Sequence, residues 1–224
     1  MKLYMHPVSM TSRPVRLFIA ENGIEVEEQV VDLMTGEHLG EAYGKVNPNR
    51  LVPVLEDGDL VLTESSAILK YLADKIDSPA YPKDLKARAR VNEMMDWFNT
   101  NFYRDFGYGL IYPQVFPHHR RRSDEAQEAC LEWGKAGAQR WLAVLNDHWL
   151  GPDKPYLCGD QITIADYFGS GLLTLGEVVR CDFQAWPNIA RWLGNMKALK
   201  SWPAVNDVFY GFVEAVKEQP FERV

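Results

Sequence analysis

Hydroxyl side chains crowd the turn that follows the first predicted strand. The segment from His6 to Pro14 carries three of them just before a predicted helix. The amino end of a helix bears partial positive charge and stabilises an anion, a thiolate included. Ser12, close before Pro14, is most simply the helix cap. Ser9 is too early in the turn to cap the helix, so we expect it to be free to serve a ligand.

A second group of polar residues opens another predicted helix. Thr63, Glu64, Ser65 and Ser66 directly follow a predicted strand. Backbone N–H groups and a hydroxyl at a helix amino terminus bind a carboxylate, and Glu64 beside them can hold an ammonium group. Together they suit the head group of an amino acid. Ordinary helix capping is the alternative interpretation of the same residues.

A proline interrupts the apolar segment Leu-Val-Pro-Val-Leu at residues 51–55. Proline cannot donate to a β-ladder, so it marks an edge strand or a special backbone geometry. A cis Val52–Pro53 bond would turn the N–H and C=O groups of Val52 outward, where they could pair with an extended peptide. An ordinary trans proline is the alternative, and these residues alone favour it.

The elements that must position these groups change in character near residue 80. Short apolar runs, turns and helix signals alternate before it, which predicts a small α/β domain over residues 1–77. A proline-containing linker over 78–83 and an all-α domain over 84–224 follow, so the fold class is a two-domain α+β protein. We expect strands at 2–5, 26–31, 51–55 and 60–62, and helices from 14, at 65–76, 84–112, 123–149, 163–179, 187–199 and 203–216, with a loop of weak helical character over 32–46.

Composition excludes several function classes. The 24 Lys and Arg residues against 31 Asp and Glu give a net charge of −7, which argues against a nucleic-acid partner and against an anionic membrane surface. No apolar run approaches the ~18–20 residues of a membrane span. Cys130, Cys158 and Cys181 form no Cys-x-x-Cys pair, which fits a reducing cytoplasm.

The remaining conspicuous motifs favour structural interpretations. The adjacent His118 and His119 lack the i, i+4 spacing of a helical metal site, so we expect no metal, and we interpret residues 118–122 as a solvated loop. Thr163 and Asp166 have the spacing of a capping box at the start of a helix.

Taken together, these segments resemble the cytosolic glutathione S-transferases. Residues 47–58, 62–65 and 67–72 match the pattern of that family's glutathione site. Residues 32–39 and 84–91 are similar to the theta class and its bacterial relatives, and residues 156–166 resemble the family's N-capping box. The resemblance covers nearly the whole chain.

The resemblance implies a thioredoxin-like N-terminal domain, an all-α second domain, a cytoplasmic homodimer and a role in detoxification. It implies a cis Val52–Pro53 bond, with the Val52 main chain paired to the cysteinyl part of glutathione, the co-substrate. Glu64 and Ser65 would hold the γ-glutamyl end. His38, with Arg50, would approach the glycine carboxylate.

The resemblance also implies a catalytic hydroxyl. Aligning Ser9 with the first position of the family pattern Ser-x-Pro-Cys-Arg makes it the candidate that stabilises the glutathione thiolate, and Thr11 and Ser12 then replace the family's Pro and Cys. Ser12 is the runner-up. We expect the pocket for a hydrophobic electrophile to be lined by Met10 and by aromatic residues, although aromatic residues at helical spacing can equally be core: Tyr103, Phe106, Tyr108, Tyr112 and Phe116.

Three functions remain open. The first is a glutathione transferase that conjugates glutathione to a hydrophobic electrophile. The second is a specialised glutathione-dependent dehalogenase or ether-cleaving enzyme, which differs only in the identity of the electrophile. The third is a non-catalytic binding or regulatory protein of the same fold.

Overall fold

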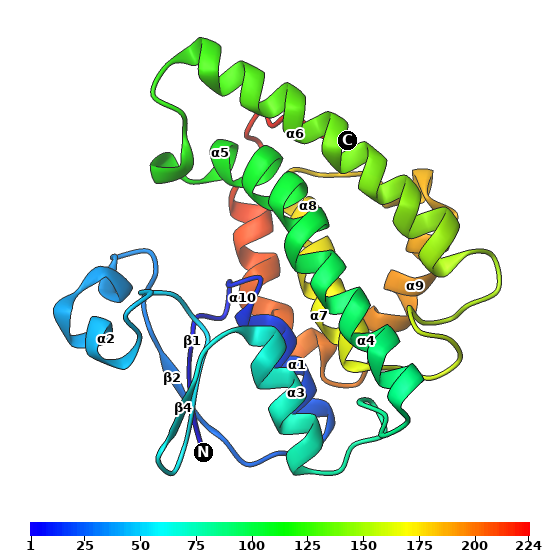
Figure 1. Cartoon of the computed structure of the whole chain (residues 1–224). Coiled ribbons are helices and arrows are strands. Elements are labelled where there is room, and N and C mark those ends of the chain that lie inside the picture. The colour runs from blue at the N-terminus through cyan, green and yellow to red at the C-terminus, as the bar shows by residue number, and fades with distance from the viewer.

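The computed structural model describes residues 1–224 as a small sheet lying beside a larger group of helices (Figure 1). The sheet has the strand order β2-β1-β3-β4. β1 pairs in parallel with β2, whereas β3 runs antiparallel to both β1 and β4. A parallel pair needs a crossover, and α1 supplies it between β1 and β2. The first elements are β1 (Lys2–Met5), α1 (Ser12–Glu21), β2 (Glu27–Val30), α2 (Glu41–Val46), β3 (Val54–Asp57), β4 (Leu60–Leu62) and α3 (Ser65–Lys75).

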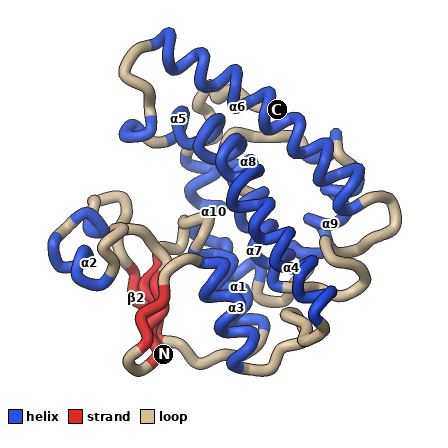
Figure 2. The backbone as a smooth tube through the Cα atoms, viewed as in Figure 1, coloured by secondary structure: helices blue, strands red, loops and turns tan.

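The sheet has one face toward α1 and α3, and Figure 2 shows it at one edge of the molecule. The predicted strand at 51–55 begins only at Val54. The carbonyl of Leu51 instead accepts from the Tyr43 hydroxyl at 2.7 Å and from the Asn47 side chain at 2.8 Å. The loop predicted over 32–46 contains α2 and a 3₁₀ turn at Glu37–Leu39. The bonds from Tyr43 and Asn47 to Leu51 hold the segment before β3 away from the ladder.

Helices make up the rest of the chain, as the sequence predicted. α4 (Leu85–Trp97) runs through wider π-helical turns at Phe98–Phe102 and Arg104–Ile111 into α5 (Tyr112–Val115). α6 (Asp124–Val144) ends in a π-helical turn at Leu145–Leu150. The helix predicted at 163–179 is divided at Thr174. The remaining helices are α7 (Ile164–Leu173), α8 (Leu175–Val178), α9 (Pro187–Lys197) and α10 (Trp202–Ala215).

One hydrophobic core joins the sheet-containing part to the helices. α7 is buried along its whole length, and Tyr167 on it meets Phe18 of α1 edge to face at 5.3 Å. Arg13 of α1 is almost fully buried and donates to Asn206 of α10 at 2.5 Å and to Thr174 at 3.0 Å. These bonds fix α1, and the turn before it, against the helical part.

The capping box predicted at the start of α7 is confirmed. Asp166 is fully buried, and its carboxylate accepts four hydrogen bonds. One oxygen accepts from the N–H of Thr163 at 2.8 Å and from its hydroxyl at 2.9 Å. The other accepts from the N–H of Leu157 at 2.8 Å and from the indole of Trp192 at 2.9 Å. One carboxylate therefore joins α7, α9 and the loop before α7.

Two glycines allow α6 to cross the helical stretch before α5 at very short range. A Cβ atom built on Gly134 would lie 2.4 Å from the carbonyl carbon of Gly109. Real Cβ atoms do not come so close to a backbone, so neither helix could hold its position with a larger residue at Gly134.

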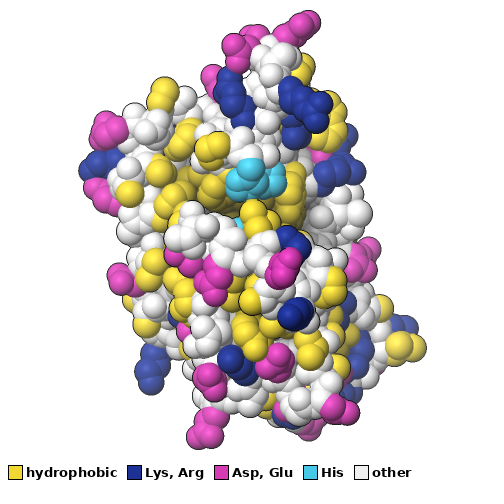
Figure 3. Space-filling model, turned by 90° about the vertical axis from the view of Figure 1, so that its left-hand side faces the viewer, with side chains coloured by type: hydrophobic (Ala, Val, Ile, Leu, Met, Phe, Trp, Pro, Cys, Tyr) yellow, Lys and Arg dark blue, Asp and Glu magenta, His cyan; other side chains and the backbone are white.

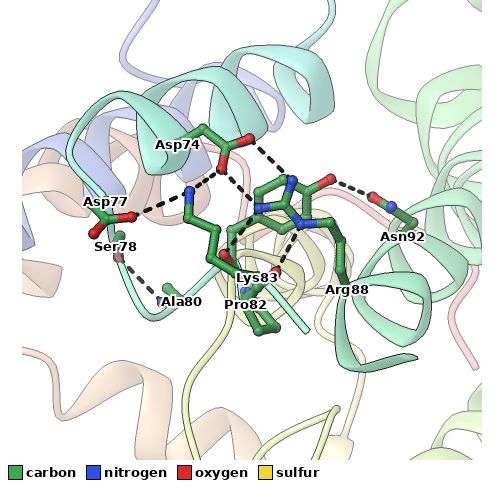
Figure 4. Close-up of polar contacts among 9 residues, drawn as sticks. Asp74, Asp77, Ser78, Ala80, Pro82, Lys83, Arg88 and Asn92 are labelled. Carbon is green, nitrogen blue, oxygen red and sulfur yellow. Dashed lines mark hydrogen bonds and ion pairs between the residues drawn. The ribbon is translucent and has the colours of Figure 1, made fainter. Parts of the chain in front are cut away.

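The segment between α3 and α4 is fixed by charged side chains (Figure 4). Asp74 at the end of α3 accepts from Lys83 and from Arg88, each at 2.8 Å. Arg88 also donates to the carbonyl of Pro82 at 2.7 Å and lies over the ring of Tyr81.

No helix is both long enough and apolar enough to cross a membrane.

Candidate active site

A cavity of about 530 Å³ lies where the loops at one end of the sheet meet the helical stretch around α4 and α5. Figure 3 shows it as a hollow in which hydrophobic side chains surround several histidines. Both parts of the chain contribute to its wall. Most of the residues singled out from the sequence line it: Ser9, Met10, His38, Arg50, Val52, Pro53, Glu64, Ser65, Tyr103, Tyr108, Tyr112 and Phe116.

The Ser9 side chain, and not that of Ser12, accepts hydrogen bonds from the backbone where α1 begins, and Thr11 in the cap position makes no side-chain cap bond. The Ser9 hydroxyl oxygen accepts from the N–H of Thr11 at 3.3 Å and from that of Ser12 at 3.2 Å. The Ser9 carbonyl accepts from the N–H of Arg13 at 3.0 Å, so the first helical turn begins earlier than the proline suggested. With its oxygen accepting from the backbone, Ser9 still has a hydroxyl hydrogen to donate.

Ser12 lies in a different environment. Its side chain is fully buried, its hydroxyl oxygen has no hydrogen-bond partner, and it does not line the cavity. Of the two candidate serines, only Ser9 therefore reaches the space where a ligand could bind.

The Val52–Pro53 bond is cis, which confirms what the resemblance implied. The N–H of Val52 donates to no protein group, and its carbonyl accepts from the Thr11 hydroxyl at 3.0 Å. Val52 and Pro53 both line the cavity. The main chain of Val52 therefore offers a donor and a partly used acceptor to a peptide-like ligand.

Glu64 has a left-handed backbone, with φ of 64° and ψ of 110°, immediately before α3. A residue other than glycine held in such a conformation costs about 1–3 kcal/mol, and strained residues of this kind cluster at functional sites. The Glu64 side chain makes no cap bond to α3. Ser65, the first residue of α3, is buried and lines the cavity beside Glu64. This geometry brings a carboxylate and a helix amino terminus together.

His38 lies in the 3₁₀ turn at Glu37–Leu39, and Arg50 donates a hydrogen bond to the carbonyl of Leu39. The Nδ1 atom of His38 is buried and has no partner. Burial lowers the pKa of His38, and the positive charge that His118 can carry lowers this pKa further. Arg50 thus holds the turn that presents His38 to the cavity.

Tyrosines form the opposite wall. The rings of Tyr103 and Tyr108 lie 5.1 Å apart, those of Tyr108 and Tyr112 lie 5.0 Å apart, and the hydroxyls of Tyr103 and Tyr112 are hydrogen-bonded. Burial raises the pKa of both Tyr103 and Tyr112, so both rings stay neutral near neutral pH. Phe106 corrects the expectation for this wall, because it is fully buried against Phe102 in the core and does not line the cavity.

Comparison with known proteins agrees with this architecture. The glutathione S-transferase N-terminal domain family matches residues 1–74, and the C-terminal domain family matches residues 110–200. Human glutathione S-transferase theta-2 is 36% identical in an alignment that covers 88% of this chain and 81% of the relative. The chain belongs to the glutathione S-transferase family. Bovine glutathione S-transferase theta-1 is 34% identical, in an alignment that covers 94% of this chain and 85% of the bovine chain.

Solved structures of theta-class glutathione S-transferases have the same fold. Human theta-2 in complex with glutathione superposes with a TM-score of 0.83 at 31% identity, over 99% of this chain and 92% of that chain. A human theta-class enzyme in complex with the glutathione conjugate of 1-menaphthyl sulfate gives a TM-score of 0.85 at 32% identity, over 98% and 91% of the two chains. The two-part α+β fold expected from the sequence is therefore confirmed.

Sequence reasoning missed the histidines of this glutathione S-transferase cavity. His6, His118 and His119 line it together with His38, although residues 118–122 were expected to form a solvated loop. His118 is exposed at the rim, whereas the ring of His119 packs 5.2 Å from that of Tyr112. The only sequence signal for His118 and His119 was the nearby Phe116, which was itself expected to line the pocket. These side chains form no group that could hold a metal ion.

Proposed function

We propose that Ser9 donates its hydroxyl hydrogen to the sulfur of glutathione and thereby stabilises the thiolate. A free thiol of this kind has a pKa of roughly 8.5–9, so only a few per cent is ionised at neutral pH. Lowering this pKa by about two units takes ~2.7 kcal/mol, which one charge-assisted hydrogen bond and a helix end can supply. The observation that carries the proposal is the Ser9 oxygen, which accepts from two backbone N–H groups at the start of α1 while the side chain lines a cavity.

Glutathione would bind along the loops of the sheet. The main chain of Val52, beside Pro53, would pair with the cysteinyl residue. Glu64 would hold the γ-glutamyl ammonium group, and Ser65 with the amino end of α3 would hold its carboxylate. His38, on the turn that Arg50 supports, would face the glycine carboxylate. The unpartnered N–H of Val52 and the left-handed backbone of Glu64 support this assignment.

A hydrophobic electrophile would occupy the other side of the cavity. The thiolate would attack its carbon, forming a C–S bond while the leaving group departs with its electron pair, or adding to a conjugated double bond. The apolar and neutral phenolic surfaces of the wall support this class of substrate: Met10, Tyr103, Tyr108, Tyr112 and Phe116.

We propose the same organisation that the sequence suggested: a glutathione-binding domain over 1–77, a linker over 78–83 and a helical domain over 84–224. A cytoplasmic homodimer with no nucleic-acid partner completes the proposal. The extent of the two family matches supports the two-domain organisation. The net charge of −7 supports the absence of a nucleic-acid partner, and the three free cysteines support the cytoplasm.

The Ser9→Ala variant tests the catalytic assignment, with Ser12→Ala as the matched control. We expect Ser9→Ala to lower kcat/KM with an aryl halide by about 100-fold, because a donor aimed at developing negative charge is worth roughly that much. The pKa of the bound thiol should rise by about two units. Ser12→Ala should retain nearly full activity.

Two results would contradict the assignment. One is an equal loss of activity in both variants, and the other is a loss in Ser12→Ala alone. Tight retention of the wild type on immobilised glutathione without turnover of aryl halides, alkyl halides or epoxides would favour the non-catalytic alternative.

A further inference from the structure

Thr11 connects the Ser9 hydroxyl to the main chain of Val52. Its hydroxyl oxygen lies 3.1 Å from that of Ser9, and its hydrogen is donated to the carbonyl of Val52 at 3.0 Å. Thr11 and its two hydrogen-bond partners, Ser9 and Val52, all line the cavity. The family pattern has proline at this position, which has no hydroxyl, so the connection belongs to this chain.

The direction of every hydrogen in this chain of bonds can be assigned. A threonine hydroxyl has one hydrogen, and Thr11 gives it to Val52, so Ser9 must be the donor in the contact between the two hydroxyls. The Ser9 oxygen in turn accepts from the N–H groups of Thr11 and Ser12. In the free protein the Ser9 hydrogen therefore points at Thr11.

We propose that Thr11 is a positioning residue that reverses its hydrogen bond when glutathione docks. This inference rests on the proposed function, in which the cysteinyl N–H of glutathione binds the Val52 carbonyl and the sulfur lies beside Ser9. The incoming N–H takes the free lone pair of the carbonyl, which then no longer depends on Thr11 for a hydrogen-bond partner. The charged sulfur is a stronger acceptor for the Ser9 hydrogen than the neutral Thr11 oxygen.

Both hydroxyls then rotate. The Ser9 hydrogen turns to the sulfur. The Thr11 hydrogen turns from the Val52 carbonyl to the Ser9 oxygen, where it replaces the 3.3 Å bond from the Thr11 N–H, so that this oxygen still accepts two bonds. This removes the repulsion between two oxygens that would otherwise face each other without a hydrogen between them. A Ser9 hydroxyl that accepts from the Thr11 hydroxyl instead of from this long N–H contact is a better donor, because bonds in a chain polarise one another. No covalent bond to the protein changes, and the thiol proton leaves to solvent. Recognition of the peptide main chain is thereby coupled to the acidity of the thiol.

The experiment compares Thr11→Val, which keeps the shape without the hydroxyl, with Thr11→Ser, which keeps the hydroxyl. The pKa of bound glutathione is measured from the ultraviolet absorbance of the thiolate against pH. We expect Thr11→Val to raise this pKa by about 0.5–1 unit, the effect of one neutral hydrogen bond. Thr11→Ser should restore the wild-type value. Thr100→Val, at an exposed threonine outside the cavity, is the control and should leave it unchanged.

A second measurement separates this role from simple loss of structure. The Kd of S-methylglutathione, which has no thiol to ionise, should change less than about threefold in Thr11→Val, because the Val52 carbonyl remains available. An unchanged or lowered thiol pKa in Thr11→Val overturns the inference. A raised pKa that Thr11→Ser fails to restore, or that accompanies an equal loss of S-methylglutathione binding, also overturns it. A wild-type complex whose thiol keeps its ordinary pKa instead overturns the proposed function.

Discussion

Ser9 combines a structural and a chemical role because a hydroxyl both accepts and donates. Its oxygen accepts from the backbone N–H groups of Thr11 and Ser12 at the start of α1, and its hydrogen remains for a neighbour. An alanine at this position would lose both contributions. Ser12→Ala keeps both contributions of Ser9, so the comparison assigns a loss of activity to the Ser9 hydroxyl rather than to any serine of this segment.

At the same scale, His38 gives a prediction about pH. A carboxylate beside His38 favours its protonated form, so binding raises a pKa that burial lowers in the free protein. A pKa raised on binding means that affinity is fullest at low pH and is lost as pH rises through the pKa of the complex. We therefore expect S-methylglutathione to bind more tightly at about pH 5.5 than at about pH 7.5, by up to roughly tenfold if binding raises this pKa by about one.

Calorimetry at the two pH values tests this prediction. His38→Gln should bind more weakly at about pH 5.5 and lose most of the difference between the two conditions. His148→Gln, at an exposed residue outside the cavity, should behave like the wild type. The same pH dependence in His38→Gln and in the wild type would assign the proton uptake to another group.

The types and order of the residues predicted which of them line the cavity, but not the backbone geometry that they adopt there. Ser9, Glu64 and Ser65 were found from their order next to strands and helices, and all three line the cavity. No sequence signal marks the left-handed backbone of Glu64, because glycine is the residue expected there. His118 was missed because its place at the rim depends on how the chain turns after α5, and a pair of adjacent histidines has no periodic pattern.

Among the elements, the helical stretch that forms the cavity wall departs from the pattern in the sequence. An α-helix aligns residues three or four apart, which placed Phe106 on the same face as Tyr103. A π-helical turn bonds residues five apart and thus aligns Tyr103 with Tyr108. Phe106 consequently turns into the core. The helix itself was predictable from periodicity, but the wider turns depend on tertiary packing.

The capping box of α7 gives a prediction at the scale of the element. Asp166→Ala leaves four donors in a dry site without an acceptor, and each such donor costs about 1–3 kcal/mol. After partial relaxation we expect the free energy of unfolding in urea to fall by roughly 3–5 kcal/mol. Asp160→Ala, at an exposed position, is the control. Glutathione affinity of the folded Asp166→Ala protein should not change, and wild-type stability would contradict this account.

At the scale of the molecule, the two parts share one core, and the charged contacts after α3 fix the segment that joins them (Figure 4). The Lys83 and Arg88 partners lower the pKa of Asp74. Its contribution to stability is therefore present above the ordinary carboxyl pKa and is lost as pH falls through the lowered value. The fold class was predictable from the alternation of elements, but the packing of α1 on α7 and α10 was not, because the pairing of helix faces leaves no local signal.

Asp74→Asn tests how much this contact contributes. The carboxylate is partly exposed, so we expect the free energy of unfolding to fall by only about 0.5–1 kcal/mol at neutral pH. The difference from the wild type should shrink in about 1 M salt, where charges are screened beyond ~3 Å. Asp59→Asn, in the exposed turn between β3 and β4, should have no effect. A loss that persists in high salt would show that packing rather than charge is responsible.

The glycine crossing between α6 and the cavity wall extends the control of substrate choice beyond the cavity. Gly109 lies on the same π-helical stretch as Tyr108, and its backbone touches that of Gly134. A methyl group added at Gly134 would push the two helices apart and carry the tyrosines with them. Selection for new electrophiles can therefore act at a position that no electrophile reaches.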